Sequence, residues 1–114
     1  MGIEVLIRRK IIQEKEKLVA PLMLELRSIA RAQPGYVSSE FLRCIDPPDE
    51  TEYLIRSTWD HIADWKNWFQ SEARKAIQEK IDAITEVETE YRIYEPLVDG
   101  ILEKPTPSQS ACNC

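Results

Sequence analysis

The stretch from Tyr53 to Arg74 constrains the fold most strongly, because its hydrophobic period changes from that of a strand to that of a helix. Its first part, which ends at Trp59, is dense in β-branched and aromatic residues and is typical of a strand. From Ile62 the apolar residues recur at helical spacing, and Asp60 is placed to cap that helix. The same stretch holds all three tryptophans and the only histidine. We therefore expect any pocket to lie at this strand–helix junction.

Three further stretches alternate apolar and polar side chains and therefore predict strands. They span residues 3–11, 36–45 and 87–94. Residues 46–50 form a turn too short for a crossover helix, so the strands on either side should pair as an antiparallel hairpin. The residues predicted for the buried faces are Ile3, Val5 and Ile7, then Val37, Phe41 and Ile45, and finally Val87, Tyr91 and Ile93.

Two longer stretches have the spacing of amphipathic helices. The first spans residues 13–32, and Pro21 predicts either a start near Ala20 or a kink. The second begins at Ser71, a suitable N-cap, and continues to about Thr85. The predicted buried stripes are Leu18, Leu22, Leu26 and Ile29, with Val19, Met23 and Ala30 beside them, in the first helix, and Ala73, Ile77, Ile81 and Ile84 in the second.

The predicted order β-α-β-β-α-β is that of a ferredoxin-like α+β domain with a four-stranded antiparallel sheet. Two helices can cover only one face of this sheet, and the other face combines leucines with charges of both signs. That face is either solvated or stacked on its copy in a two-fold homodimer, and the leucines at strand centres favour the homodimer. Its predicted members are Leu6, Arg8, Glu40, Leu42, Leu54, Arg56, Glu88, Glu90, Arg92 and Tyr94.

A length of 114 residues fits one domain, which we place at residues 1–96, followed by a Pro/Ser-rich tail at residues 97–114. The net charge of −5 argues against nucleic-acid binding, since the only basic run is Arg8-Arg9-Lys10. No apolar run reaches the ~18 residues of a membrane span, and no signal peptide is recognisable. We therefore expect no membrane association and a cytoplasmic location.

The three cysteines predict neither a disulfide framework nor a metal site. Cys44 stands alone in a predicted strand, and Cys112 and Cys114 lie at the end of the tail. Two tail thiolates and a distant His61 are too few ligands for a metal site. We therefore expect no metal.

Three motifs lie where the predicted elements meet: Gln33-Pro-Gly-Tyr36, Tyr53-Leu-Ile-Arg-Ser-Thr-Trp59 and Trp65-Lys-Asn-Trp68-Phe-Gln-Ser71. Together they resemble the antibiotic biosynthesis monooxygenase (ABM) domain family over roughly residues 3–96. The resemblance implies a dimeric α+β barrel with a pocket in each subunit between the helices and the sheet. Members of the family include cofactor-independent oxygenases of aromatic quinols, haem-degrading enzymes and small-molecule isomerases.

The haem-degrading branch of that family uses an Asn on its first strand, a Trp on the helix after the third strand, and a His ten residues beyond that Trp. Trp68 matches the Trp, but Ile7 occupies the region of the Asn and Gln78 the place of the His. Haem iron needs an axial ligand such as His, and His61 does not substitute for it by register. The resemblance therefore disfavours haem degradation.

The cofactor-independent branch implies that the protein binds an electron-rich phenol or quinol, helps to remove its proton and lets the anion react with molecular oxygen. No cofactor is then expected. The candidate catalytic residues are Trp68, Arg74 as a cation, His61 as a base and Asn67 as a polar positioner, and the candidate substrate-binding residues are Trp59, Trp65, Tyr36, Tyr91 and Gln78.

Each candidate has a structural alternative. The tryptophans could simply form the core. Arg74 could form a surface ion pair on its helix, and His61 and Asn67 could be exposed to solvent. Two functions therefore stay open: an oxygenase of a small aromatic molecule, and a non-catalytic dimeric module that binds a small apolar ligand or only retains the fold.

Overall fold

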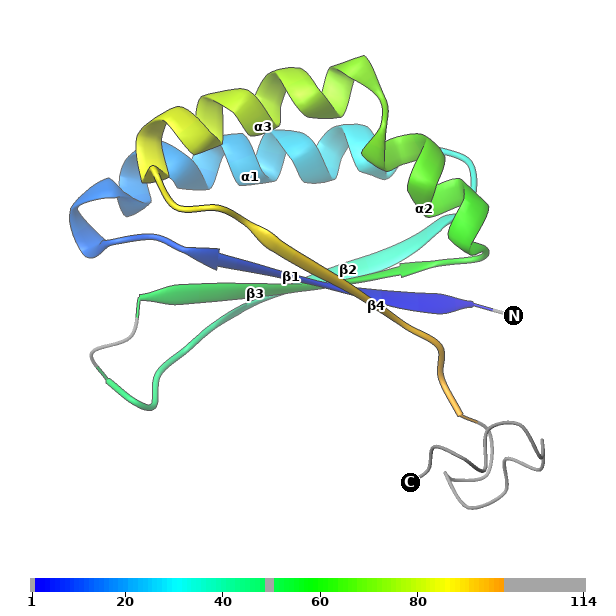
Figure 1. Cartoon of the computed structure of the whole chain (residues 1–114), viewed down its shortest axis with the longest axis horizontal. Helices are drawn as coiled ribbons and strands as arrows, with labels where there is room; N and C mark the ends of the chain where they lie inside the picture. Colours follow the sequence, from blue (N-terminus) through cyan, green and yellow to red (C-terminus); the bar gives the residue numbers. More distant parts are fainter. Residues whose placement is uncertain (1, 49–50, 98–114) are drawn as a thin grey trace.

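Four strands form one antiparallel sheet in the order β2-β3-β1-β4, and the helices lie on one of its faces (Figure 1). The computed structural model describes residues 2–48 and 51–97; apart from Leu97, the predicted tail with Cys112 and Cys114 lies outside them. This arrangement confirms the ferredoxin-like α+β fold. The elements are β1 Ile3–Lys10, the short 3-10 helix η1 Gln13–Lys15, α1 Glu16–Ala30, β2 Tyr36–Arg43, β3 Glu52–Trp59, α2 Ile62–Phe69, α3 Glu72–Thr85 and β4 Glu90–Tyr94.

The predicted strand–helix junction forms where β3 ends at Trp59 and α2 begins at Ile62. β2 and β3 pair as the predicted hairpin, and β1 lies between β3 and β4. A capping prediction was wrong, because the N-cap of α2 is His61 and not Asp60. The backbone N–H of Asp60 instead donates to the carbonyl of Gly35 at 2.7 Å, which joins the end of β3 to the turn before β2.

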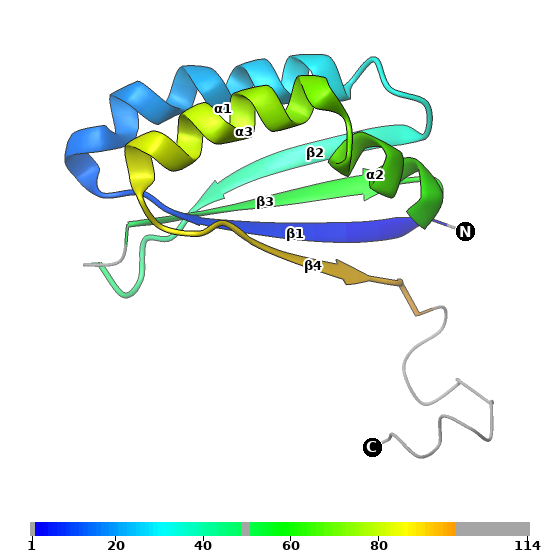
Figure 2. The same cartoon turned by 45° about the horizontal axis from the view of Figure 1, so that its top comes forward.

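The core lies between the helices and the sheet, where α1 and α3 run side by side along the strands (Figure 2). Val5 and Ile7 of β1 are buried as predicted, and Ile11 continues the same alternation after the strand has ended. Trp59 of β3 and Ile81 of α3 are fully buried in this core. The helix α1 begins at Glu16 and contains Pro21. The predicted start near Ala20 was therefore wrong.

The buried stripe of α1 is rotated from the predicted one. Val19, Met23, Leu26 and Ala30 are buried, whereas Leu18 is 59% exposed. Leu18 and Val19 are adjacent apolar residues, so the sequence allows either of two neighbouring buried stripes on α1. Packing against the sheet buries the stripe that contains Val19.

The buried face of β2 was predicted wrongly at both ends. A register shift between Tyr36 and Ser38 interrupts the alternation, so Val37 does not face the core and is 52% exposed. The strand also ends at Arg43, which leaves Ile45 82% exposed. The bulge turns Tyr36 and Ser39 toward the helices together with Phe41, opposite Trp59, Ser57 and Ile55 of β3.

Three further buried-face predictions, in α3 and around β4, were wrong. Ala73 of α3 is exposed, and Arg74 is buried in its place. β4 begins at Glu90, so Val87 precedes the strand and is exposed. Ile93 is opposite Val5, but it lies on an edge strand that has no further neighbour among the described strands and stays partly exposed.

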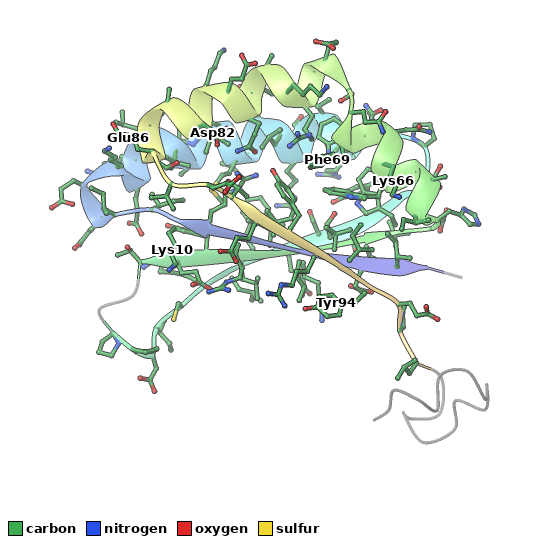
Figure 3. All side chains as sticks on the ribbon, viewed as in Figure 1. Lys10, Lys66, Phe69, Asp82, Glu86 and Tyr94 are labelled. Carbon is green, nitrogen blue, oxygen red and sulfur yellow. The ribbon has the colours of Figure 1, made fainter. Side chains whose placement is uncertain are left out.

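The opposite face of the sheet, which we call the open face, has no helix over it in the described chain (Figure 1). Figure 3 shows Tyr94 on this side and Phe69 on the helix side, at the corner between α2 and α3. Arg8 pairs with Glu52 and Glu90, and Arg56 pairs with Glu40. No helix in the described part of the chain could span a bilayer. The open-face residues that pair across the strands are Leu6, Arg8, Glu40, Leu42, Leu54, Arg56, Glu90, Arg92 and Tyr94.

Candidate functional site

A cavity that is partly open to solvent lies between the sheet and the helices. Its walls come from β1, β2, β3 and β4 below and from the three α-helices above. Most of these side chains are apolar or aromatic, as in most small-molecule sites. The lining residues are Ile7, Arg9, Met23, Leu26, Arg27, Ala30, Tyr36, Ser39, Phe41, Ile55, Ser57, Trp65, Trp68, Arg74 and Tyr91.

The helix α2 supplies two tryptophans to this cavity. Trp65 and Trp68 are three residues apart, so they lie on the same face of α2, and both are buried. The ring of Trp65 packs against Phe69 and Tyr91, with centroids 5.6 and 6.1 Å apart. Trp59 packs edge to face on Trp65 at 5.9 Å and does not line the cavity. Trp59 therefore supports the wall from behind.

Arg74 projects from the first turn of α3 beneath the helices. Ser71 is the N-cap of that helix, as predicted, and its hydroxyl accepts the backbone N–H of Arg74 at 3.2 Å. The Nε of Arg74 donates to the carbonyl of Phe69 at 2.7 Å, and Nη1 donates to the hydroxyl of Tyr91 at 3.1 Å. The guanidinium also lies 4.2 Å above the ring of Phe69, a cation–π contact. Arg74 is thus a buried cation held by neutral groups, and not the surface ion pair of the alternative interpretation.

A second buried arginine, Arg9 of β1, was not among the predicted site residues. Its Nη1 donates to Oε1 of Gln78 at 3.0 Å and to the hydroxyl of Thr89 at 3.1 Å. Gln78 is fixed in turn, because its Nε2 donates to Asp82 at 2.8 Å. Burial lowers the pKa of the Arg9 guanidinium, and the nearby charge of Arg74 lowers it further, while Tyr91 and Asp82 act in the opposite direction.

The cavity is positively charged in a protein whose net charge is negative. Three of its lining residues, Arg9, Arg27 and Arg74, are cations, and none is an Asp or a Glu. The whole chain carries a formal charge of −5. Low-dielectric walls strengthen such local charge, so the cavity favours an anionic guest.

The structure brings together five of the nine predicted site residues, which are Trp68, Arg74, Trp65, Tyr36 and Tyr91. Gln78 adjoins them, because its Oε1 accepts the hydroxyl of Tyr91 at 3.2 Å. The other three are Trp59, which lies behind the wall, and His61 and Asn67, which are exposed on α2 and do not line the cavity.

His61 lies at the N-cap of α2, and its side chain is 68% exposed. Its Nδ1 lies 3.3 Å from Oδ2 of Asp64. Among the described residues, no three His, Cys, Asp or Glu side chains gather in a way that could hold a metal ion.

Comparisons with known proteins show the family and the fold of the chain. Residues 2–80 match the antibiotic biosynthesis monooxygenase (ABM) family. This chain belongs to the ABM family. The matched range runs from β1 through the β2–β3 hairpin and α2 into α3, and it ends before β4. No curated protein shows a sequence match to the chain.

Several solved structures share the fold of this ABM protein at low sequence identity. A conserved protein of Methanosarcina mazei is 18% identical, with a TM-score of 0.76 over 85% of this chain and 94% of the other. A Mycobacterium tuberculosis protein is 12% identical, with a TM-score of 0.74 over 89% and 100%. SnoaB of Streptomyces nogalater, a cofactor-independent oxygenase, is 13% identical, with a TM-score of 0.72 over 87% and 98%.

Proposed function

We propose that this ABM-family protein is a cofactor-independent monooxygenase of an aromatic, quinol-like small molecule. The observation that carries the proposal is the aromatic cavity, in which Trp68 and Tyr36 form apolar walls and the guanidinium of Arg74 lies buried against Tyr91. An aromatic ring fits between such walls, and a cation stabilises a phenolate in low dielectric. The SnoaB comparison supports the same reaction class.

The proposed reaction converts a phenol with a free para position, together with O2, into a para-quinone and water. The phenol first loses its proton, and the para carbon of the phenolate then forms a bond to oxygen and yields a peroxide. Loss of the para hydrogen and cleavage of the O–O bond leave one oxygen atom as the new carbonyl and release the other as water. The substrate supplies all four electrons, so the balance requires no external reductant.

Arg74 has the central role in this scheme. A cation close to the phenol lowers the pKa of that hydroxyl and so favours the anion that reacts with O2. The residues lining the cavity include no carboxylate and no imidazole, so we assign the departing proton to water at the solvent-open mouth. Trp68 and Trp65 position the ring and exclude water around it.

Haem does not fit this site. The only histidine of the chain, His61, is exposed on α2 and does not line the cavity. Gln78 is engaged by Arg9, Asp82 and Tyr91, so the position ten residues after Trp68 has no free iron ligand.

A second candidate function is binding without catalysis. It is favoured by the same set of cavity-lining residues, which has no side chain that ordinarily accepts a proton near neutral pH. A non-catalytic module of this kind would bind the aromatic ligand between the same walls and leave O2 unreduced.

We also propose that the protein is a homodimer joined through its open face. Leu42 is 48% exposed there beside Leu54, and Arg8 and Arg56 alternate with carboxylates across the strands. A self-complementary pattern of this kind suits a two-fold contact.

Oxygen uptake by chelator-treated protein, measured with a panel of dihydroxynaphthalenes and hydroxynaphthoates, tests the proposed reaction. We expect uptake above the autoxidation rate, a Trp68→Ala rate reduced at least tenfold, and an unchanged rate in Asn67→Ala, whose side chain is exposed on the same helix. Binding without uptake would establish the second candidate instead. Equal rates in wild-type protein and Trp68→Ala would reject this cavity as the reaction site.

A further inference from the structure

Arg9 carries a buried N–H group that no described residue satisfies. The residue is only 5% exposed and lines the cavity. Its hydrogen bonds to Gln78 and Thr89 leave from Nη1, and Nε is buried without a partner among residues 2–48 and 51–97. A buried charged donor without an acceptor costs free energy, so its presence needs an explanation.

No carboxylate of the described chain forms an ion pair with Arg9 or with Arg74. The nearest acid in the Arg9 network, Asp82, is hydrogen bonded to Gln78 and reaches Arg9 only through that amide. Buried charges in proteins are normally paired or neutralised. The cavity therefore has positive charge on its β1 and α3 walls, and the described residues supply no matching anion.

The free edge of Arg9 has a definite chemical preference. A guanidinium binds a carboxylate side-on through two parallel N–H donors, and the Nε edge is one of the edges that can do so. Hydrogen bonds of Arg9 and of Tyr91 converge on Oε1 of Gln78, and Tyr91 in turn accepts from Arg74. A carboxylate bound to Arg9 would therefore lie close to the hydroxyl of Tyr91 and to the guanidinium of Arg74 that bonds to it.

We propose that the cavity binds an aromatic carboxylic acid, whose carboxylate pairs with the Nε edge of Arg9 and whose neighbouring hydroxyl faces Arg74. This inference rests on the proposed function, because it names the substrate class of the same cavity. Arg9 is then the residue that determines specificity, and the ring lies against Trp68 and Tyr36. An ortho-hydroxy aromatic acid has this arrangement of groups.

Isothermal titration calorimetry under anaerobic conditions tests the inference with two probes of similar size and shape, 1-hydroxy-2-naphthoate and 1-hydroxy-2-naphthamide, of which only the first carries a negative carboxylate. We expect the wild-type protein to bind the acid at least tenfold more tightly than the amide. In Arg9→Gln the preference should fall below twofold, and Arg9→Lys should restore only part of it, because an ammonium lacks the planar fork. Lys75→Gln, which removes the same charge from an exposed site on α3, should keep the full preference.

Equal affinity of wild-type protein for acid and amide would overturn the inference, as would a full preference in Arg9→Gln. If Arg9→Gln does not fold, the comparison of the two probes on wild-type protein still decides the matter. Equal affinity for acid and amide, together with O2 uptake from neutral phenols that have a free para position, would overturn the inference and leave the proposed function standing. Failure of both probes to bind would overturn both, since the cavity would then not hold an aromatic ring.

Discussion

Nη1 of Arg74 lies 3.1 Å from the phenolic oxygen of Tyr91, and this hydrogen bond joins α3 to β4 at the wall of the cavity. The hydroxyl of Tyr91 donates onward to Gln78 at 3.2 Å, and Gln78 also accepts from Arg9. One tyrosine on an edge strand thus connects the two buried arginines. That hydroxyl group bonds directly to Arg74 and to Gln78, and Gln78 in turn accepts from Arg9.

Removal of the Tyr91 hydroxyl should destabilise the protein. Tyr91→Phe leaves Arg74 and Gln78 without one partner each in a partly buried site, which costs about 1–3 kcal/mol of unfolding free energy. The matched control is Tyr94→Phe, because Tyr94 lies on the same strand but on the open face and is exposed. Urea denaturation of both variants measures the difference, and equal stabilities would show that the Tyr91 hydroxyl contributes nothing.

Much of the fold follows from local sequence patterns. The third strand was predicted at the residues of β3, Glu52–Trp59, because its aromatic and β-branched residues lie between a turn and a helix cap. Ser71 was predicted as an N-cap, and its hydroxyl does accept the N–H of Arg74. Such features depend on a few neighbouring residues, which is why the sequence alone predicts them.

Features that depend on distant partners were missed. The bulge in β2 turns Val37 outward through its pairing with β3, and no residue near Val37 indicates it. Arg9 was considered in the sequence only as part of the basic run Arg8-Arg9-Lys10. Its position nevertheless indicated burial, because residues two apart on a strand share a face, and Val5, Ile7 and Ile11 at that spacing are all buried.

Gly35 should not tolerate a side chain. Its φ is 84°, in the left-handed region that favours glycine, and a Cβ there would collide with the carboxylate of Asp64. Gly35→Ala should cost at least about 1–2 kcal/mol from backbone strain alone. Thermal or urea denaturation measures this loss.

A second substitution separates the strain at Gly35 from the collision. The added Cβ would meet the Cβ of Asp64 as well as its carboxylate, so only glycine at position 64 relieves the contact. In the double variant Gly35→Ala/Asp64→Gly part of the lost stability should return, while the backbone strain remains. Asp64→Gly alone serves as the reference for the cycle. A double variant as unstable as the sum of the two single variants would show that the collision plays no part.

The ion pair between Glu52 and Arg8 should make stability depend on pH in acid. Hydrogen bonding to Arg8 lowers the pKa of Glu52 below its usual 4.5, so the pair stabilises the fold above that value and loses its effect as the pH falls further. Glu52→Gln should therefore cost about 0.2–1 kcal/mol at pH 7, and the difference from wild type should shrink as the pH falls below 4.5. Glu79→Gln, an exposed substitution on α3, is the control. A constant difference between Glu52→Gln and wild type from pH 7 to pH 3 would contradict this account.

The open face should mediate self-association. Leu42→Lys places a charge on this face, where Leu42 is 48% exposed, whereas Leu24→Lys makes the same change on α1, where Leu24 is 55% exposed. We expect wild-type protein and Leu24→Lys to sediment as dimers at micromolar concentration and Leu42→Lys to sediment as a monomer. A monomeric wild-type protein would reject the stacked-sheet dimer.

The most direct measurement of the central claim is the fate of the two oxygen atoms when the chelator-treated protein reacts with a hydroxynaphthalene substrate under ¹⁸O₂. The proposed reaction predicts that the quinone product gains one ¹⁸O atom by mass spectrometry, that the other appears in water, and that hydrogen peroxide does not accumulate. A product without ¹⁸O, formed together with hydrogen peroxide, would show simple oxidation and contradict monooxygenation in the cavity of Arg74 and Trp68.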